Sequence, residues 1–372
     1  MSLQAQALIM AGGTGGHIFP GLAVAQGLQE DGWRVHWLGG EAPSMESELV
    51  PRAGYEYHTL DFKGVRGKGF KRMIVAPFAL LKALISSVRI IRKLKPQVVL
   101  GFGGYISLPG GLASFLCRVP LVLHEQNAKA GMANLFLSKL TSLCFSAFPD
   151  AIKGGQWVGN PLREDFLKLP PPEQRYDARS GALRVLVVGG SLGAKALNEV
   201  VPKALALLPE ASRPVVIHQS GAKQIQGLEA AYQEAGVKAQ LVPFIEDMAS
   251  VMANVDVMVS RAGASTVTEI AAAGVASLLV PFPFAVDDHQ TANAEFLTAQ
   301  SAAWICQQSE LTPQWLANWF ESLSRDQLRD VAIKAYGQKS TQAVKTLCDV
   351  ARGQAVRQGF PISAAMGQEH AS

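Results

Sequence analysis

The sequence is poor in the residues that hold small secreted domains and metal centres together. Its 372 residues include only four cysteines, none in a C-x-x-C pair or in a metal-type spacing with histidine. This usage is typical of reduced thiols in a reducing compartment, so we expect a cytosolic protein without a disulfide framework. The four are Cys117, Cys144, Cys306 and Cys348.

Export signals and membrane spans are also missing. The amino terminus lacks a basic region, and its apolar stretch from Ala7 to Ala11 is too short for a signal peptide. The uncharged stretch from Val98 to Cys117 contains many glycines and Pro109, which would leave backbone groups without partners in lipid. The sequence therefore predicts neither an export signal nor a transmembrane span.

Acidic residues are absent between Phe62 and His124, a segment that contains eleven lysines and arginines. The rest of the chain has 23 basic and 30 acidic residues, so the positive charge is local. A local basic segment favours an anionic surface or ligand as its partner. The basic residues are Lys63, Arg66, Lys68, Lys71, Arg72, Lys82, Arg89, Arg92, Lys93, Lys95 and Arg118.

An apolar stripe runs through this basic segment at helical spacing, and Pro77 suits the first turn of a helix. One interpretation is that the stripe packs on a sheet while the cations face water. The other is a patch that docks on an anionic membrane, where each Lys or Arg contributes about 1 kcal/mol. A nucleic-acid platform is disfavoured because interleaved aromatic residues are missing. The stripe comprises Ile74, Phe78, Leu81, Ile85 and Val88.

Strand-like runs alternate with helix-like windows along the whole chain, which predicts an α/β fold with doubly wound parallel sheets. The pattern restarts at Arg184 after a proline-rich stretch, so we expect two Rossmann-like domains, 1–161 and 162–340, with a cleft between them. A final helix at about 341–352 could pack back on the first. The strand-like runs are Ala7 to Ala11, Arg34 to Leu38, Val98 to Gly101, Leu121 to His124, Arg184 to Val188, Val215 to Gln219, Val255 to Ser260 and Ser277 to Val280.

Three apolar runs end in paired-glycine turns, at Ala7 to His17, Val98 to Tyr105 and Val185 to Ala194. Glycines at the end of a strand let peptide N–H groups and a helix amino terminus approach an anion. The turns therefore favour a nucleotide or diphosphate ligand. Ile18 and Ile106 stand where the dinucleotide fingerprint requires its last glycine, so NAD is disfavoured.

One competing motif is the G-x-S-x-G of Gly189 to Gly193, the context of a serine hydrolase with Ser191 as nucleophile. Asp256 and His289 follow in the order that a triad requires. A phosphate-facing loop is the preferred interpretation of the same turn. The hydrolase remains an alternative at this point.

The segment Arg261 to Glu269 offers small residues, free N–H groups and a carboxylate one turn into a helix, as a nucleoside diphosphate requires. Alternatively, Thr266 and Glu269 have the spacing of a capping box and could only start the helix. The run Asp287 to Asn293 adds amide groups suited to sugar hydroxyls, or is simply a polar helix start.

Together these motifs resemble the MurG family of N-acetylglucosaminyltransferases, over nearly the whole chain. The resemblance implies a GT-B fold and inverting transfer of N-acetylglucosamine from UDP-N-acetylglucosamine to the 4-hydroxyl of the muramic acid of lipid I. The product would be lipid II for peptidoglycan synthesis, which connects the enzyme to cell-wall biogenesis, cell shape and cell division. The motifs are AGGTGGHIFPGLAVA from Ala11, GFGGY from Gly101, HEQN from His124, GNPLR from Gly159, GGSLGA from Gly189, RAGASTVTE from Arg261 and DDHQTANA from Asp287.

The resemblance also implies roles for individual residues. Ile245 would recognise the uracil, Glu269 the ribose, and Gln290 and Asn293 the sugar. The diphosphate would lie on Ala264, Ser265, Thr266, Val267 and Thr268, and Ser191 and Arg163 would reach the nucleotide. Thr14, Gly15, Gly16 and Asn127 would complete the cleft from the acceptor side.

Chemistry and location follow from the implied reaction. His17 is the candidate base, because histidine readily exchanges a proton near neutral pH, and Glu125 is the alternative. No metal or other cofactor is expected, since helix amino termini and Arg163 can stabilise the departing UDP. The expected location is the cytoplasmic face of the bacterial inner membrane. Anionic lipids are the expected partners, cell-wall synthesis proteins are candidate partners, and no nucleic acid is expected. The docking patch would comprise Lys71, Arg72, Ile74, Val75, Phe78, Leu81 and Lys82.

Overall fold

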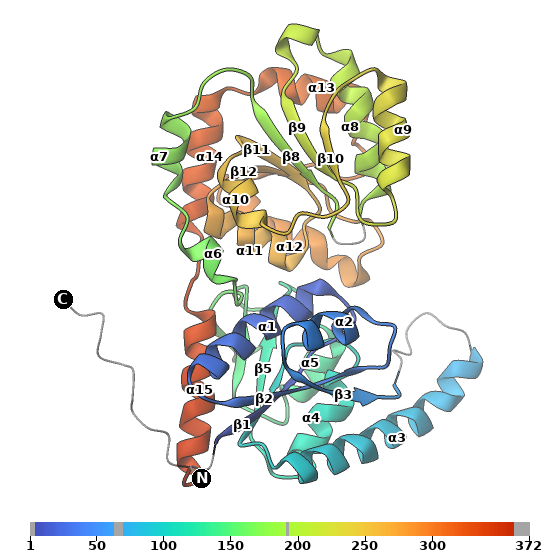
Figure 1. The fold of residues 1–372 in the computed structure, drawn as a ribbon, viewed down its shortest axis with the longest axis vertical. Helices are drawn as coiled ribbons and strands as arrows, with labels where there is room; N and C mark the ends of the chain where they lie inside the picture. The colour runs from blue at the N-terminus through green and yellow to red at the C-terminus, as the bar shows by residue number, and fades with distance from the viewer. Residues whose placement is uncertain (1–3, 63–69, 191–192, 361–372) are drawn as a thin grey trace, which may run out of the picture. The chain divides into compact units, whose positions relative to one another are not determined.

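The computed structural model describes residues 4–62, 70–190 and 193–360, and the chain divides into two compact units (Figure 1). The first unit comprises Met1–Gln126, Ala130–Pro161 and Gln342–Ser372, and the second comprises Asn127–Lys129 and Leu162–Thr341. Each unit contains one sheet of parallel strands. The chain therefore builds two separate α/β cores.

The first sheet has seven strands in the order β3-β2-β1-β4-β5-β6-β7. Successive residues of β1 point to opposite faces, so Ile9 packs with helices α1 and α15 while Leu8 packs with α3 and α4. Helix α15 lies against α1, where a Cβ on Gly27 would be 3.0 Å from Cys348 Sγ. The elements are β1 (Gln6–Met10), α1 (Gly15–Glu30), β2 (Arg34–Gly40), α2 (Met45–Arg52), β3 (Glu56–Leu60), α3 (Phe70–Leu94), β4 (Val98–Gly101), α4 (Ser107–Leu116), β5 (Leu121–Glu125), α5 (Met132–Leu137), β6 (Cys144–Ser146), β7 (Gln156–Trp157) and α15 (Ala343–Arg357).

The second sheet has six strands in the order β10-β9-β8-β11-β12-β13. Helix α8 packs against α9 and α13, and α14 packs against α7 and α11 (Figure 1). The elements are α6 (Glu164–Leu167), α7 (Pro172–Asp177), β8 (Arg184–Val188), α8 (Lys195–Leu207), η1 (Glu210–Ser212), β9 (Val215–Gln219), α9 (Ile225–Ala235), β10 (Gln240–Val242), α10 (Met248–Ala253), β11 (Val257–Ser260), α11 (Ala264–Ala273), β12 (Ala276–Leu279), η2 (Val286–Asp288), α12 (His289–Thr298), β13 (Trp304–Ile305), α13 (Pro313–Ser322) and α14 (Arg325–Gly337).

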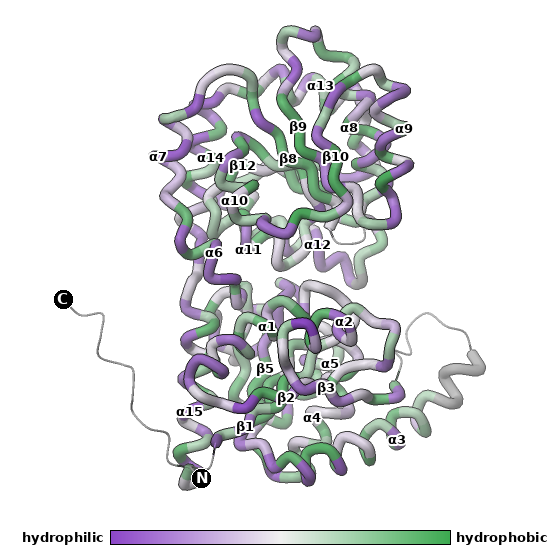
Figure 2. Tube along the Cα trace, viewed as in Figure 1, coloured by the Kyte–Doolittle hydropathy of each residue, from purple (hydrophilic) through white to green (hydrophobic). Residues whose placement is uncertain are grey.

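The central strands of each sheet are largely hydrophobic, as the green colour of β8 and β9 shows (Figure 2). Residues Leu8 to Met10 and Val185 to Val187 are entirely buried, which is expected for parallel strands covered on both faces. The four cysteines are free thiols. Among the described residues, no helix is long and apolar enough to cross a membrane.

Helix α3 differs from the sequence prediction at its start. It begins at Phe70, so Pro77 lies inside the helix and not in its first turn. The side chains of Lys71, Arg72, Ile74 and Val75, predicted for the docking patch, lie outside the described part of the chain. The helix itself packs against α4.

Candidate active site

The first paired-glycine turn joins β1 to α1 and presents free backbone donors. Thr14 precedes the helix in an extended conformation, and its carbonyl accepts from His17 N at 3.1 Å and Ile18 N at 3.2 Å. The N–H groups of Gly15 and Gly16 lie in the first turn and therefore have no partner within the helix. This turn can bind an anion or an anionic oxygen.

A buried carboxylate that the sequence analysis did not identify holds this turn. Glu46, at the second position of α2, is fully buried, and its Oε2 accepts from Gly13 N at 3.2 Å. Its Oε1 accepts from Gly40 N at 3.3 Å and from the Tyr105 hydroxyl at 3.2 Å. One carboxylate therefore fixes three segments, although nothing in its own sequence context indicates this role.

The second glycine turn lies against the first turn. Gly104 has a φ of +81°, and a Cβ at this position would be 2.3 Å from the carbonyl oxygen of Gly12. A Cβ on Gly103 would be 3.0 Å from the His17 ring. These glycines are therefore required by close packing around the first turn.

A chain of hydrogen bonds sets the proton positions on His17. Burial lowers the pKa of His124 to about 4, and its Nε2–H donates to Gly159 O at 2.8 Å. The neutral ring then accepts at Nδ1 from Gln126 Nε2, at 3.0 Å. Gln126 Oε1, which can only accept, lies 2.8 Å from His17 Nδ1. His17 therefore carries its proton on Nδ1, and its Nε2 has a free lone pair when the ring is neutral.

The alternative base, Glu125, is occupied in local structure. Its side chain is buried, and Oε2 accepts from Gly131 N at 3.1 Å and from Asn134 Nδ2 at 2.8 Å. These bonds fix the start of α5. Glu125 thus stabilises the loop after β5, whereas His17 is only half-buried.

Helix α11, in the second unit, begins with backbone N–H groups that have no partner within the helix, and the Ser265 hydroxyl lies among them. Gly263 is the residue before the helix, and its carbonyl accepts from Val267 N at 2.9 Å. The N–H groups of Ala264, Ser265 and Thr266 thus have no partner within the helix. Ser265 Oγ is buried and has no hydrogen-bond partner among the described residues. Such a concentration of unsatisfied donors is suited to an anion.

The capping-box interpretation of this segment is wrong. Thr266 lies inside the helix, and no side chain caps its amino terminus. Glu269 is one turn further in, with a side chain 22% exposed and 4.0 Å from Arg163 Nη2. Burial raises the pKa of Glu269 to about 7, and the charge of Arg163 opposes this shift. Arg163 also donates to Glu246 O at 3.2 Å.

Other residues that were predicted to bind the nucleotide sugar form hydrogen bonds within the protein. Thr268 Oγ1 donates to Ala264 O at 3.0 Å, and Ile245 N donates to Gln219 Oε1 at 3.2 Å. Gln290 Oε1 accepts from Phe282 N at 2.9 Å. The Thr268 bond lies within α11, whereas the other two hold the backbone of Ile245 and of Phe282 in place.

Asn293 and Asn127 occur together in the second unit. Asn293 is fully buried, and its Oδ1 accepts from Ala128 N at 2.8 Å. Its Nδ2 lies 3.3 Å from Asn127 Oδ1 and 3.2 Å from Ala262 O. Asn293 therefore connects the segment Asn127–Lys129 to the loop before α11.

The hydrolase alternative is not supported. Ser191 lies outside the described residues, but its turn follows the carboxyl end of β8, whereas Asp256 precedes the amino end of β11. These two strands are parallel neighbours, so the serine turn and the aspartate lie at opposite edges of the sheet. Asp256 is instead fully buried between Arg179, at 3.2 Å, and Arg325, at 3.3 Å.

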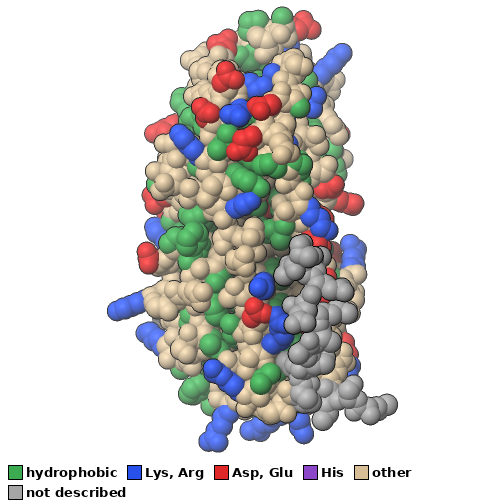
Figure 3. Space-filling model, turned by 90° about the vertical axis from the view of Figure 1, so that its left-hand side faces the viewer, with side chains coloured by type: hydrophobic (Ala, Val, Ile, Leu, Met, Phe, Trp, Pro, Cys, Tyr) green, Lys and Arg blue, Asp and Glu red, His purple; other side chains and the backbone are tan. Residues whose placement is uncertain are grey.

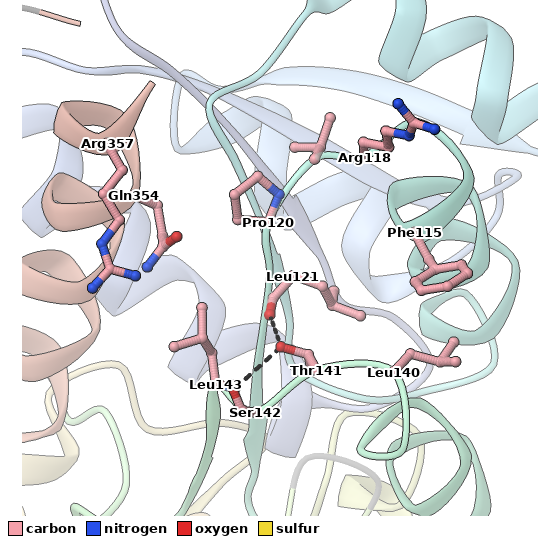
Figure 4. Close-up of a pocket in the computed structure, with 11 residues that line it drawn as sticks. Phe115, Arg118, Pro120, Leu121, Leu140, Thr141, Ser142, Leu143, Gln354 and Arg357 are labelled. Atoms are coloured by element: carbon pink, nitrogen blue, oxygen red, sulfur yellow. Dashed lines mark hydrogen bonds between the residues drawn. The ribbon is translucent and has the colours of Figure 1, made fainter. Parts of the chain in front are cut away.

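A pocket of about 470 Å³ in the first unit lies away from the glycine turns (Figure 4). Its lining includes Arg118 and Arg357, residues 119–121, which lead into β5, and residues 140–143, which precede β6. Within this lining, Thr141 Oγ1 donates a hydrogen bond to Leu121 O at 2.7 Å. The pocket is therefore at the amino ends of the strands, opposite the edge where the candidate active site lies.

Two regions of the chain match protein families. Residues 7–145 match the glycosyltransferase family 28 N-terminal domain, and residues 184–347 match the glycosyltransferase family 28 C-terminal domain. A protein of Polaromonas naphthalenivorans named UDP-N-acetylglucosamine-N-acetylmuramyl-(pentapeptide) pyrophosphoryl-undecaprenol N-acetylglucosamine transferase is 57% identical over 351 residues. The match covers 93% of this chain and 98% of that protein.

Two further relatives agree with this match. A protein of the same name from Albidiferax ferrireducens is 57% identical over 333 residues, covering 88% of this chain and 86% of its own. The crystal structure of MurG from Acinetobacter baumannii is similar with a TM-score of 0.81 at 41% identity. That similarity covers 94% of this chain and 99% of the MurG chain.

Proposed function

The chain belongs to glycosyltransferase family 28 and, within it, to the MurG family of N-acetylglucosamine transferases, and from this premise we propose its reaction. It transfers N-acetylglucosamine from UDP-N-acetylglucosamine to lipid I and so forms lipid II. The observation that carries this proposal is the identity of 57% to a transferase so named, over nearly the full length of both chains. We further propose that the 4-hydroxyl of muramic acid is the acceptor and that the anomeric carbon is inverted.

The donor binds at the start of α11. The free N–H groups of Ser265 and Thr266 and the unpaired Ser265 hydroxyl donate to the diphosphate, where the positive end of the helix dipole adds to them. Glu269 accepts from the ribose hydroxyls, which favours its ionised form. Arg163, already 4.0 Å from this carboxylate, adds positive charge near the nucleotide.

His17 is the base that removes the proton of the acceptor hydroxyl. Its Nδ1 proton is held by Gln126, so Nε2 is the atom that accepts the incoming proton. Gln126 is itself fixed by His124 and thereby acts as a positioning residue. As His17 becomes charged, Gln126 Oε1 continues to accept from Nδ1, and no proton has to move along the chain.

The departing UDP is stabilised by protein groups, and we expect no divalent metal in the transfer step. Negative charge grows on the diphosphate as the glycosidic bond breaks, and preorganised N–H donors stabilise charge where it develops. The start of α11 and Arg163 can provide this stabilisation in place of a metal.

A patch on α3 docks the enzyme on the cytoplasmic face of the inner membrane, where anionic lipids attract it. Phe78 is 73% exposed and Leu81 is 53% exposed, next to Lys82. The excess of basic side chains is not confined to α3, because Figure 3, which faces the side of the first unit that carries α15, also shows more Lys and Arg than acidic side chains there. Lys82 lies 2.6 Å from Asp61, so the net charge of the patch depends on its other cations.

Vesicle binding tests this docking patch. The double variant Phe78→Ser, Leu81→Ser should leave a smaller fraction of the protein bound to sedimented anionic vesicles. Its rate of transfer to a short-chain soluble acceptor should be unchanged. Leu207→Ser, at a residue of the second unit that is 52% exposed, is the matched control. Equal vesicle binding by the patch variant and the control would refute the patch.

Product analysis tests the reaction itself. Purified protein with UDP-N-acetylglucosamine, a short-chain lipid I analogue and EDTA should form a disaccharide product detectable by mass spectrometry, and only when the acceptor is present. Turnover of the donor without the acceptor would instead indicate a sugar epimerase. Loss of all transfer in EDTA would contradict the metal-free mechanism.

A further inference from the structure

Two histidines and a glutamate lie together on neighbouring strands of the first sheet, outside the candidate active site. His36 is on β2, and Glu56 and His58 are on β3. His36 is paired in register with Glu56, and Leu38 with His58. Because alternate residues of a strand share a face, all three side chains lie on the same face of the sheet.

Two of the three separations between ligand atoms in this cluster are close to those of a tetrahedral metal site. His36 Nδ1 is 3.3 Å from His58 Nε2 and 3.2 Å from Glu56 Oε2, and all three atoms lie within 4.8 Å of one another. Zinc bonds to nitrogen and oxygen of about 2.0–2.2 Å in tetrahedral geometry place neighbouring ligand atoms about 3.3–3.6 Å apart. The pairs that include His36 already have this spacing, and the Glu56 and His58 side chains lie close enough to approach one ion.

Neighbouring groups orient two of these ligands. Gln6 Oε1 accepts from His36 Nε2 at 2.9 Å, which leaves His36 Nδ1 without a proton and directed at the cluster. Arg34 binds Oε1 of Glu56, with its Nε at 3.0 Å, and leaves Oε2 facing His36. Partners of this kind fix the tautomer and orientation of metal ligands in known sites.

The surroundings act on the charge of the cluster in both directions. Burial lowers the pKa of His36 and of His58. The hydrogen bond from Arg34 lowers the pKa of Glu56 and keeps it ionised. The cations Arg34 and Lys93 oppose a metal ion, and Lys93 contributes to the lowered pKa of His58.

We propose that His36, Glu56 and His58 bind one Zn²⁺ ion, with water in the fourth position. Two imidazoles and one carboxylate favour zinc over magnesium or calcium, which prefer oxygen ligands. Glu56 is half-exposed, so an ion and its water can enter from solvent. The ion joins the edge strand β3 to β2.

This site is separate from the proposed transfer chemistry. His36 and His58 lie within the strands, whereas the first glycine turn follows the carboxyl end of β1. The ion therefore stabilises the edge of the sheet, and its removal by EDTA leaves transfer unaffected. No sequence motif indicates the site, because its ligands come from two strands, with His36 twenty residues before Glu56.

Zinc titration of untagged, EDTA-dialysed protein tests the site. Calorimetry should show one equivalent of Zn²⁺ bound, and Co²⁺ should give the intense visible absorption of tetrahedral coordination. His58→Gln and Glu56→Gln should each weaken zinc binding at least tenfold, as losses around metal sites do. Asp177→Asn removes a carboxylate paired with Arg329 at 2.8 Å in the second unit and is the matched control, with unchanged zinc affinity.

The melting temperature provides an independent readout. Saturating Zn²⁺ should raise the melting temperature of the wild-type protein and of Asp177→Asn but not that of Glu56→Gln. The proposal is overturned if the wild-type protein binds no zinc, or if Glu56→Gln and His58→Gln bind it as tightly as the wild type. Glu56 is on the surface, so its variant stays informative even if His58→Gln fails to fold.

Discussion

The hydrogen-bond chain behind His17 leads to a quantitative prediction about two substitutions. His17→Ala removes the proposed base and should lower kcat by about 10²- to 10⁴-fold, the usual contribution of general base catalysis. Gln126→Met keeps the side-chain shape but removes the acceptor that lies 2.8 Å from His17 Nδ1. A lost hydrogen bond of about 0.5–1.5 kcal/mol corresponds to a decrease in kcat of about 2- to 13-fold.

Steady-state assays with the lipid I analogue separate this effect from donor binding. The KM for UDP-N-acetylglucosamine should stay unchanged in both variants, because the proposed donor site lies in the second unit. Gln26→Met is the control for the substitution itself, since it makes the same replacement on the exposed side of α1 and removes a side-chain hydrogen bond to Glu30, at 3.0 Å. A His17→Ala enzyme with the kcat of the wild type would refute the assignment of the base.

Three further perturbations test the donor site and the glycine turns. Burial raises the pKa of Glu269 to about 7, so the neutral acid accumulates below that pH and UDP-N-acetylglucosamine should bind more weakly as the pH falls through it. Calorimetry with Glu269→Gln should give weak binding at every pH. Ser265→Ala should lower the affinity for UDP-N-acetylglucosamine about tenfold or more, because a hydrogen bond to a charged group contributes about 1.5–3 kcal/mol. The melting temperature should stay unchanged, since Ser265 Oγ has no hydrogen-bond partner among the described residues. Gly104→Ala should lower the free energy of unfolding, measured in urea, by about 1–3 kcal/mol more than Gly32→Ala does. Both glycines have a φ of +81°, but a Cβ on Gly104 would meet backbone atoms, whereas no described atom lies within 4 Å of one on Gly32. Equal losses for the two glycine variants would show that the close approach to Gly12 is unimportant.

The central strands could be predicted from the sequence because burial on both faces makes them continuous apolar runs. Strands β4, β8 and β9 occur at the predicted residues. The prediction missed β3, β6, β7, β10 and β13, which are short or lie toward sheet edges. Strand β3 has one buried residue in five, and its pairing with β2 decides its structure, so its own pattern carries little signal.

Parts of the candidate site could not be predicted because their roles depend on distant neighbours. Glu46 acts on Gly13 and Gly40, and Gln126 connects His17 to His124, contacts that no local spacing reveals. The three paired-glycine turns were predicted to share one role, the approach to phosphate, but the physical reason for their glycines differs from turn to turn. The hydrolase alternative fitted the chain order of its residues, and only the strand topology excludes it.

A crystal structure of the protein with UDP-N-acetylglucosamine is the most direct test of the central claim, that the donor binds at the start of α11. The account predicts diphosphate oxygens about 2.7–3.2 Å from the backbone nitrogens of Ser265 and Thr266, with the ribose hydroxyls on Glu269. A nucleotide bound instead at Thr14 to Gly16 of the first unit, with no density at the start of α11, would contradict it.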